Sequence, residues 1–323
     1  MQFCYSQSQK VKLLCRRQKG KRMKKKVIVI GGATASGKTN LSIQLAKEIN
    51  GEIISADSMQ VYKKMNIGTA KPTKAEMCGV KHYMIDELYP DEDFSVAIFK
   101  NKAKSYLEEV LEKGCTPIIT GGTGFYINAL LRDTEFVETE TDYNYRDKLY
   151  KLAEKEGNEF VHNILKEIDE ESAHKIHYNN VKRVVRAIEY CKMTGEKMST
   201  HNKREKEKES PYDVKFILLD MDRNELYNRI NLRVDTMLEN GLVKEVAGLL
   251  EEGYESSLLS MQGLGYKEIA MYLRNEVTLE ESIEMIKQGT RNFAKRQITW
   301  FKNQTTGIWM NTDNVMEQVL EKI

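Results

Sequence analysis

A run of eight residues near the amino end of the chain has the composition of a phosphate-binding loop. It fills the pattern G-x-x-x-x-G-K-S/T, in which glycines let backbone amides approach phosphate oxygens. The lysine supplies a positive charge, and the last hydroxyl can ligate Mg²⁺ beside the phosphates. The pattern predicts a site for a nucleotide or another pyrophosphate compound, formed by Gly32, Ala33, Thr34, Ala35, Ser36, Gly37, Lys38 and Thr39.

The residues on either side of this loop predict the elements that position it. The apolar run 27–30 precedes it and is typical of a buried strand, and apolar residues recur at mostly helical spacing from Leu41 to Ile49. The free amides and partial positive charge of the helix end would then face the phosphates. The alternative is a glycine turn before an ordinary helix, which the full match in a strand-to-helix frame makes the weaker interpretation.

Three aspartates each end a strand-like run, and each could serve in a site. In an open parallel sheet, ligands bind at the carboxyl ends of the strands, where the glycine loop also lies. A turn or cap role is the common alternative for such residues. Position alone does not choose among the three, which are Asp57 after 52–56, Asp86 at the end of 83–86 and Asp220 at the end of 216–220.

A second glycine turn, 121–126, follows the strand-like run 117–120 and opens a predicted helix that reaches Leu131. An earlier helix is predicted from Ser95 to a glycine C-terminus at Gly114. This order of strands, helices and glycine turns predicts an α/β fold, a P-loop doubly wound parallel sheet core with right-handed crossovers. Thr123 in the second turn could simply be the N-cap of its helix.

Composition places the chain among globular proteins of about two domains, since 41% of its 323 residues are apolar and 30% are charged. No apolar run approaches the roughly 20 residues of a membrane-spanning helix, and no signal peptide is visible. Five cysteines without close pairs argue against a disulfide framework, a metal site or a redox motif. We expect a cytoplasmic protein that does not bind membranes.

Charge is distributed unevenly along the chain. Residues 1–26 carry ten Lys or Arg and no acid, whereas the remainder has 40 basic and 48 acidic residues. We predict that residues 1–22 form a disordered basic arm. The arm could bind nucleic acid through phosphates, or Met23 could be the true start, because it leads straight into the first strand; we favour the second interpretation.

Strand-like runs disappear from about 136 to 208, where helices are predicted at 145–156, 160–168 and 180–193. We therefore predict a first core part at 23–135, a helical insert domain at 136–208 and a second core part with C-terminal helices at 209–323. Within the insert, Arg183 and Arg186 share a helix face beside Lys182, where they could clamp phosphates or be solvated. The charged run 203–209 is interpreted as a solvated helix or linker.

The second core part carries a further pair of basic residues. Arg229 and Arg233 lie four residues apart on a predicted helix, 224–240, and could form a second clamp on phosphates. The last long helix, 279–303, has basic and aromatic side chains that form either a basic aromatic face or an amphipathic helix packed on the core. The run 308–310 is predicted to be an edge strand.

Several further motifs follow the glycine loop in a fixed order. They are DSMQVY at 57–62, IGTAKP at 67–72, GGTGFY at 121–126, RVVRAIE at 183–189, the stretch 229–237, GLGYK at 263–267 and the stretch 290–301. In this order the motifs resemble those of the bacterial tRNA dimethylallyltransferases, also called tRNA isopentenyltransferases. The resemblance covers about Lys24 to Trp309. The glycine loop alone is shared by many NTPases, but the set of motifs is specific.

The resemblance implies transfer of the dimethylallyl group of dimethylallyl pyrophosphate to the exocyclic amine of an adenosine. This adenosine lies directly 3′ of the anticodon in tRNAs that read codons starting with U. The glycine loop would hold the pyrophosphate with Mg²⁺, the implied cofactor, at Thr39, and Arg233 would stabilise the leaving pyrophosphate. Asp57 matches the family's general base, which would take the proton of the amine, and Thr123 is the remaining catalytic residue. The implied partners are dimethylallyl pyrophosphate and the anticodon stem-loop of tRNA, and we expect a monomer.

The resemblance also implies that the adenosine leaves its stack, which costs least in a single-stranded loop. Ala33 and Tyr178 stand where the family usually has proline, and Lys182 where it usually has glutamine. Because the body of the chain is acidic, tRNA affinity must come from local patches and should fall with salt. The residues implied to contact tRNA are Asp57, Ser58, Met59, Gln60, Thr123, Arg146, Lys182, Arg183, Val184, Val185, Arg186, Gln262, Gly263, Leu264, Gly265, Tyr266 and Lys267.

Two other classes of function stay open at this point. A P-loop kinase or NTPase would act on ATP and use one of the three strand-end aspartates as a metal ligand. A noncatalytic RNA-binding protein would use the basic arm and the last helix, and it would lose RNA binding on deletion of residues 1–22. An enzyme that prenylates a free adenine nucleotide is a chemical neighbour of the first hypothesis.

Overall fold

The computed structural model describes residues 24–136 and 143–323, so the predicted basic arm at 1–22 lies outside the described residues. The chain divides into two compact units. Among the described residues, the core unit comprises 24–90, 106–122 and 211–323, and the helical unit comprises 91–105, 123–136 and 143–210. In the part of the chain that the structure describes, no helix is long and apolar enough to cross a membrane.

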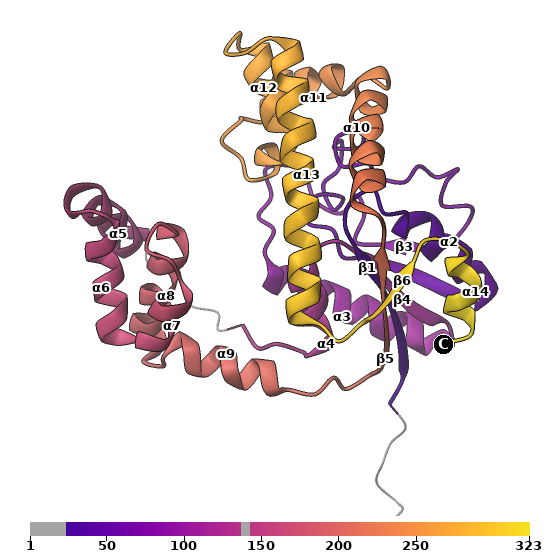
Figure 1. Cartoon of the computed structure of the whole chain (residues 1–323), viewed down its shortest axis with the longest axis horizontal. Coiled ribbons are helices and arrows are strands. Elements are labelled where there is room, and N and C mark those ends of the chain that lie inside the picture. The colour runs from indigo at the N-terminus through magenta and orange to yellow at the C-terminus, as the bar shows by residue number, and fades with distance from the viewer. Residues whose placement is uncertain (1–23, 137–142) are drawn as a thin grey trace, which may run out of the picture. The chain divides into compact units, whose positions relative to one another are not determined.

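Six parallel strands form one sheet in the core unit (Figure 1). Their order is β3-β2-β4-β1-β5-β6, so the first strand lies at the centre and strands distant in sequence become its neighbours. The parallel α/β sheet confirms the predicted fold class. The strands are β1 (Lys26–Gly32), β2 (Gly51–Ser55), β3 (His82–Tyr83), β4 (Thr116–Gly121), β5 (Asp213–Asp220) and β6 (Ile308–Asn311).

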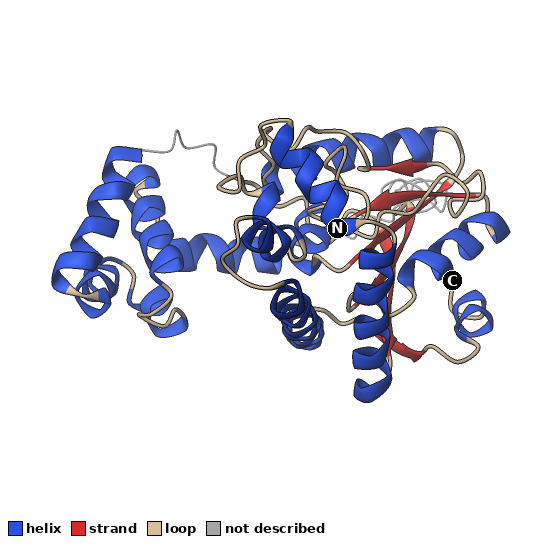
Figure 2. Ribbon diagram, turned by 90° about the horizontal axis from the view of Figure 1, so that it is seen from above, coloured by secondary structure: helices blue, strands red, loops and turns tan. Residues whose placement is uncertain are grey.

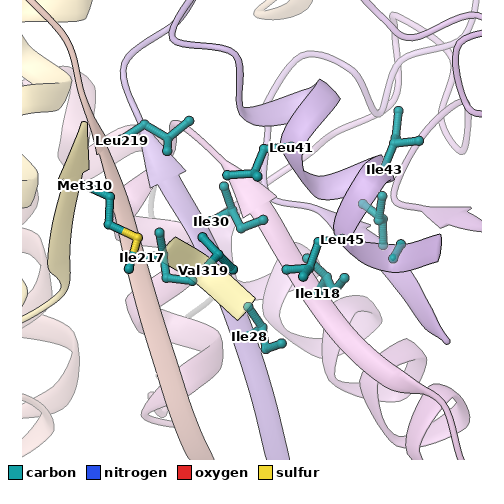
Figure 3. Packing of buried hydrophobic residues seen from close by; sticks show 12 residues of the cluster. Ile28, Ile30, Leu41, Ile43, Leu45, Ile118, Ile217, Leu219, Met310 and Val319 are labelled. Atoms are coloured by element: carbon teal, nitrogen blue, oxygen red, sulfur yellow. The ribbon is translucent and has the colours of Figure 1, made fainter. Parts of the chain in front are cut away.

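The central strand β1 is buried from its second residue onward. Ile28 and Ile30 lie on one of its faces and pack with Leu45 of α2 (Lys38–Glu48) in a cluster of buried aliphatic side chains (Figure 3). The short helix α14 (Val315–Leu320) adds Val319 to the same cluster. Side chains alternate between the faces of a strand, so α2 and α14 together cover this face of the sheet.

On the opposite face of the sheet, α13 (Leu279–Gln304) packs against the central strand β1. Gly31 of β1 lies so close to this helix that an added Cβ would stand 3.1 Å from the ring of Phe301. Figure 2 shows helices on both sides of the strands. Both faces are therefore covered, which explains the continuous apolar sequence of the central strands.

Local signals in the sequence define the other helices of the core unit. The Asp222 side chain caps α10 by accepting hydrogen bonds from two backbone amides, and Thr278 with Glu281 forms a capping box at the start of α13. These helices agree with the predicted ones to within one residue at each end. The remaining elements here are α10 (Arg223–Glu239), α11 (Leu242–Glu251), the 3₁₀ turn η1 (Ser260–Gln262) and α12 (Tyr266–Leu273).

The strand predicted over 83–86 is wrong beyond its first residue. Only His82 and Tyr83 pair with β2, as β3. Met84 and Asp86 have φ angles of 63° and 56°, in the left-handed region, which bends the chain out of the extended conformation. The predicted edge strand near the carboxyl end is confirmed as β6, which pairs only with β5.

The helical unit has its own apolar core. Helices α5, α6 and α8 contribute most of its buried side chains, and the three helices predicted in this region are confirmed. The charged run 203–209 begins within α9, so its first part is a helix. The helices of this unit are α4 (Gly124–Leu131), α5 (Tyr143–Glu156), α6 (Asn158–Ile168), α7 (Glu170–Lys175), α8 (Val181–Thr194) and α9 (Met198–Glu207), and α3 (Val96–Glu112) begins in it.

Candidate active site

A cavity of about 350 Å³ opens at the carboxyl ends of β1, β2 and β4 in the core unit. The glycine loop forms one side of it, as the sequence predicts. Other walls come from the ends of β2 and β4, from α10 and from α13. Its lining residues are Thr34, Ala35, Ser36, Gly37, Lys38, Thr39, Asn40, Ser55, Asp57, Gln60, Thr69, Ala70, Thr120, Gly121, Gly122, Arg229, Arg233, Phe293 and Gln297.

The glycine loop joins β1 to α2 in the conformation that phosphate binding requires. Ala35 and Gly37 have φ angles of 63° and 90°, and Gly37 occupies the N-cap position of α2. Glycine has no side chain to cap the helix, so the first amides of α2 remain available to a ligand. The predicted strand, loop and helix are therefore confirmed at this site.

The Lys38 ammonium lies in the cavity and donates to the backbone carbonyl of Ala33 at 2.5 Å. Burial, and then the neighbouring Arg233 guanidinium, lower the pKa of Lys38 to about 7, against the opposing effect of the Asp57 carboxylate. The cavity is thus lined by three cationic side chains, Lys38, Arg229 and Arg233, and by the carboxylate of Asp57. An anionic ligand would relieve their repulsion and raise the pKa of the lysine toward its ordinary value.

The two arginines predicted to share a helix face do so, and both line the cavity from α10. The Arg233 guanidinium donates to the Thr34 hydroxyl at 3.2 Å, and burial lowers its pKa below the ordinary value for arginine. Arg229 forms an ion pair with Glu225 at 2.7 Å, one turn earlier on the helix. Arg233 is therefore the more buried of the two and lies next to the glycine loop.

The structure separates the three strand-end aspartates. Asp57 lines the cavity, and its Oδ1 accepts hydrogen bonds from the backbone amides of Met59 at 2.8 Å and Gln60 at 3.3 Å. Asp86 instead pairs with Lys71 at 2.6 Å, and Asp220 lies exposed at the end of β5. Asp57 is thus both a turn residue and a cavity residue, so its role in the turn leaves it available to a ligand in the cavity.

Gln297 of α13 joins the two glycine turns, a role that no pattern in the sequence indicated. Its Oε1 accepts a hydrogen bond from the Thr34 amide at 2.8 Å, and its Nε2 donates to the Gly122 carbonyl at 3.1 Å. A Cβ at Gly122 would stand 2.1 Å from this nitrogen, so the second glycine is required for the contact. Gln297 belongs to the motif 290–301, but only the tertiary structure shows what it contacts.

Thr123 lies in this second glycine turn and occupies the N-cap position of α4. Its side chain makes no capping hydrogen bond to the helix. The predicted N-cap position is therefore confirmed, but the Thr123 hydroxyl does not cap helix α4.

The residues implied to contact tRNA fall into different environments. In the core unit, Gln60 lines the cavity, Gln262 and Lys267 are exposed, and Tyr266 is fully buried. In the helical unit, Val184 and Val185 are at most 1% exposed. The side chains of these two valines hold α8 in the core of its unit, so they are not surface contacts.

The basic residues of the helical unit are partly paired. Arg146 and Arg186 both form ion pairs with the buried Glu189, at 2.8 and 3.0 Å. Lys182 and Arg183, at the start of α8, are exposed. The segment 182–186 of α8, which the resemblance implies to contact tRNA, therefore has a basic exposed surface, while its two valines face inward.

Comparisons with known proteins agree with this geometry. The family model described as IPP transferase matches residues 60–304. A tRNA dimethylallyltransferase of Lachnoclostridium phytofermentans is 55% identical over 285 residues, which cover 88% of this chain and 91% of that protein. The crystal structure of a tRNA isopentenylpyrophosphate transferase of Bacillus halodurans is 42% identical, with a TM-score of 0.70 and coverage of 92% of this chain and 95% of that one.

A eukaryotic dimethylallyltransferase acting on tRNA gives a TM-score of 0.74 at 31% identity, over 89% of this chain and 74% of that chain. The family model matches most of the chain, and the Lachnoclostridium phytofermentans enzyme is 55% identical over 88% of it, so both comparisons indicate the same family. The glycine loop is thus part of a prenyltransferase fold, and the chain belongs to the IPP transferase family.

Proposed function

We propose that the chain transfers the dimethylallyl group of dimethylallyl pyrophosphate to the exocyclic amine of the adenosine directly 3′ of the anticodon in tRNA. A bond forms between the amine nitrogen and the first carbon of the prenyl group, and the bond from that carbon to the pyrophosphate oxygen breaks. The amine loses one proton, and pyrophosphate leaves. The activities for which the relatives are named support this assignment over a kinase or a noncatalytic RNA-binding protein.

The cavity supplies the groups that a leaving pyrophosphate requires. The amides of the glycine loop, Lys38 and Arg233 are positive or donate hydrogen bonds, and they stabilise negative charge as it develops on the leaving group. Two buried hydroxyl oxygens of the cavity residues Ser36 and Thr120 have no hydrogen-bond partner. Unpaired buried hydroxyls are costly, so they fit a cavity that is completed by a polar ligand.

Mg²⁺ fits this donor set as a metal held jointly by protein and substrate. In residues 24–136 and 143–323, no group of three or more His, Cys, Asp or Glu side chains could hold a metal ion. Mg²⁺ usually keeps several waters and binds one or two protein oxygens together with substrate phosphates. Thr39, which lines the cavity, would hold the ion, and the ion would add positive charge beside the leaving pyrophosphate.

Asp57 is proposed as the base that accepts the proton of the amine. The lone pair of an adenine amine is delocalised into the ring, so removal of its proton during attack favours the reaction. The observation that carries the proposal is that Asp57 shares one cavity with the glycine loop, Lys38 and Arg233. The two amide hydrogen bonds to its Oδ1 fix the orientation of the carboxylate.

Contacts with the anticodon stem-loop are proposed at 57–60, Thr123, Arg146, the basic surface of 182–186 and 262–267. The exposed Lys182 and Arg183 suit phosphate contacts, which position RNA and make its affinity fall with salt. We further propose that the chain acts as a monomer, which sedimentation equilibrium with and without tRNA tests directly.

The decisive test combines the protein with Mg²⁺, unmodified tRNA and either dimethylallyl pyrophosphate or ATP, and analyses the nucleosides by mass spectrometry. A prenylated adenosine beside the anticodon, formed only with the prenyl donor, is expected. Transfer of phosphate from ATP without prenylation would instead support the kinase alternative. The same assay compares two variants. Asp57→Asn should lose prenylation, whereas Asp220→Asn, which changes a strand-end aspartate outside the cavity lining, is the control and should keep it.

A further inference from the structure

The carboxylate of Glu245 on α11 lies outside the proposed chemistry, yet it has an unusual number of hydrogen-bond donors around it. It accepts from three consecutive backbone amides, those of Asn66 at 2.9 Å, Ile67 at 2.8 Å and Gly68 at 3.1 Å. It also accepts from the Tyr266 hydroxyl at 2.6 Å. The Glu245 side chain thus holds the turn 66–68 next to Tyr266, the first residue of α12.

Tyr266 reinforces this contact by packing. It is fully buried, and a Cβ at Gly68 would stand 2.4 Å from its ring, so only glycine allows the turn to lie so close. Burial, followed by the charge of Glu245, raises the pKa of the Tyr266 hydroxyl above its ordinary value. The hydroxyl therefore stays protonated at neutral pH and remains a donor to the carboxylate.

The turn held by Glu245 continues directly into a wall of the cavity. The carbonyls of Thr69 and Ala70 accept hydrogen bonds from the side-chain amide of Gln60, at 3.3 Å each. The backbone amide of Gln60 in turn donates to the Asp57 carboxylate. A series of direct contacts therefore leads from Glu245, through the turn and Gln60, to Asp57.

A second contact joins the same two regions. Met59, next to Gln60, packs against Gly263, where an added Cβ would stand 2.5 Å from the methionine methyl group. Gly263 belongs to the segment 262–267 that also contains Tyr266. The segments 57–60 and 262–267, far apart in the sequence, are thus joined directly by Met59 and Gly263 and indirectly through the turn 66–70. Both segments are among the residues implied to contact tRNA.

We propose that Glu245 and Tyr266 are positioning residues that couple the segment 262–267 to the placement of Asp57. They hold the turn 66–68, the turn holds Gln60, and Gln60 helps to orient the carboxylate that accepts the proton. The proposal rests on the proposed function for its kinetic consequence. The physical coupling itself depends only on the contacts of the core unit.

Glu245→Gln tests the kinetic consequence. Glutamine has nearly the same size, but its NH₂ group cannot accept from the amides, so the turn loses part of its support. Because a small misplacement of a reacting group is costly, kcat should fall roughly ten- to a hundredfold. KM for dimethylallyl pyrophosphate should stay within about twofold, since the glycine loop is untouched. Glu251→Gln, on the exposed side of the same helix, is the matched control and should leave kcat unchanged.

Hydrogen exchange of the free protein tests the coupling independently of activity. Glu245→Gln should accelerate amide exchange roughly tenfold or more in 66–70 and also in 57–60, which Glu245 does not contact, but not in the glycine loop 33–37. Tyr266→Phe removes one donor without changing charge and should give the same pattern more weakly.

Faster exchange confined to 66–68, or an equal loss of kcat and rise of KM in the variants, would overturn the proposal. If the wild-type protein does not prenylate tRNA, the proposed function fails, while the exchange pattern in 57–60 still decides whether Glu245 controls the segment that carries Asp57. If Glu245→Gln fails to fold, the Tyr266→Phe variant carries the same test.

Discussion

Two groups of cations, one in the core unit and one in the helical unit, differ in how they are paired. In the helical unit, Arg146 and Arg186 both form ion pairs with the buried carboxylate of Glu189, so each has an anionic partner within the fold. In the core unit, Lys38 and Arg233 share a cavity, and among the described residues no carboxylate lies within ion-pair distance of either. The difference teaches that a paired cation holds the fold, whereas an unpaired buried cation is available to a ligand.

Burying Lys38 and Arg233 without an ion-pair partner among the described residues costs free energy, and this cost indicates that the cavity binds an anion. Removing a charge from water without a partner is unfavourable, and the lowered pKa of Lys38 is the direct sign of this cost. A pyrophosphate would supply the missing negative charge. The cavity is therefore built for an anion, whereas the α8 surface offers exposed charges whose interactions salt can screen.

The largest expected effect is at Asp57, the carboxylate that shares the cavity with Lys38 and Arg233. Asp57→Asn keeps an oxygen to accept from the amides of Met59 and Gln60, so the turn should survive. The base is lost, and turnover should fall by roughly 10²- to 10⁴-fold, measured by single-turnover prenylation. Affinity for tRNA should be nearly unchanged. A variant that keeps a rate close to wild type would remove Asp57 from its proposed role.

Lys38→Met should affect binding of the donor next most strongly. Loss of a charge-assisted hydrogen bond costs about 1.5–3 kcal/mol, or roughly ten- to a hundredfold in affinity, measured by calorimetry with dimethylallyl pyrophosphate. Arg186→Met removes a compensated cation from the helical unit and should leave this affinity unchanged. Equal losses in the two variants would contradict the distinction between the units.

The exposed cations at the start of α8 should contribute to tRNA affinity alone. Replacing both Lys182 and Arg183 by alanine should weaken tRNA binding and reduce the slope of log K against log salt by about one for each phosphate that is no longer neutralised. Binding of dimethylallyl pyrophosphate should not change. A salt dependence identical to that of the wild type would show that these residues do not contact phosphates.

The smallest effect is a pH dependence of donor binding. The free protein holds the pKa of Lys38 at about 7, and a bound pyrophosphate raises it, so binding takes up a proton at slightly alkaline pH. Affinity should fall as pH rises through this range, by up to about fivefold between pH 7 and pH 8. Calorimetry in buffers of different ionisation enthalpy measures the proton uptake. Lys38→Met should abolish the proton uptake by the lysine, so that the remaining pH dependence of the affinity comes only from titration of the ligand.

The sequence predicted the parts of the site that are local in the chain. The strand, the glycine loop and its helix follow from one contiguous stretch, and the shared face of Arg229 and Arg233 follows from helical spacing. The choice among three aspartates depends on strand order, which brings the ends of β2, β4 and β1 together. Gln297 and Glu245 act on residues more than 170 positions away, and no local pattern marks such contacts.

The central claim is that the cavity at the glycine loop binds an isoprenoid pyrophosphate with its reactive carbon directed toward Asp57. A crystal structure with Mg²⁺, an anticodon stem-loop and an unreactive thio analogue of dimethylallyl pyrophosphate tests it most directly. We expect the pyrophosphate on the loop amides, Lys38 and Arg233, with the adenosine amine between the prenyl carbon and the Asp57 carboxylate. A pyrophosphate bound elsewhere, or an adenosine amine out of reach of Asp57, would contradict it.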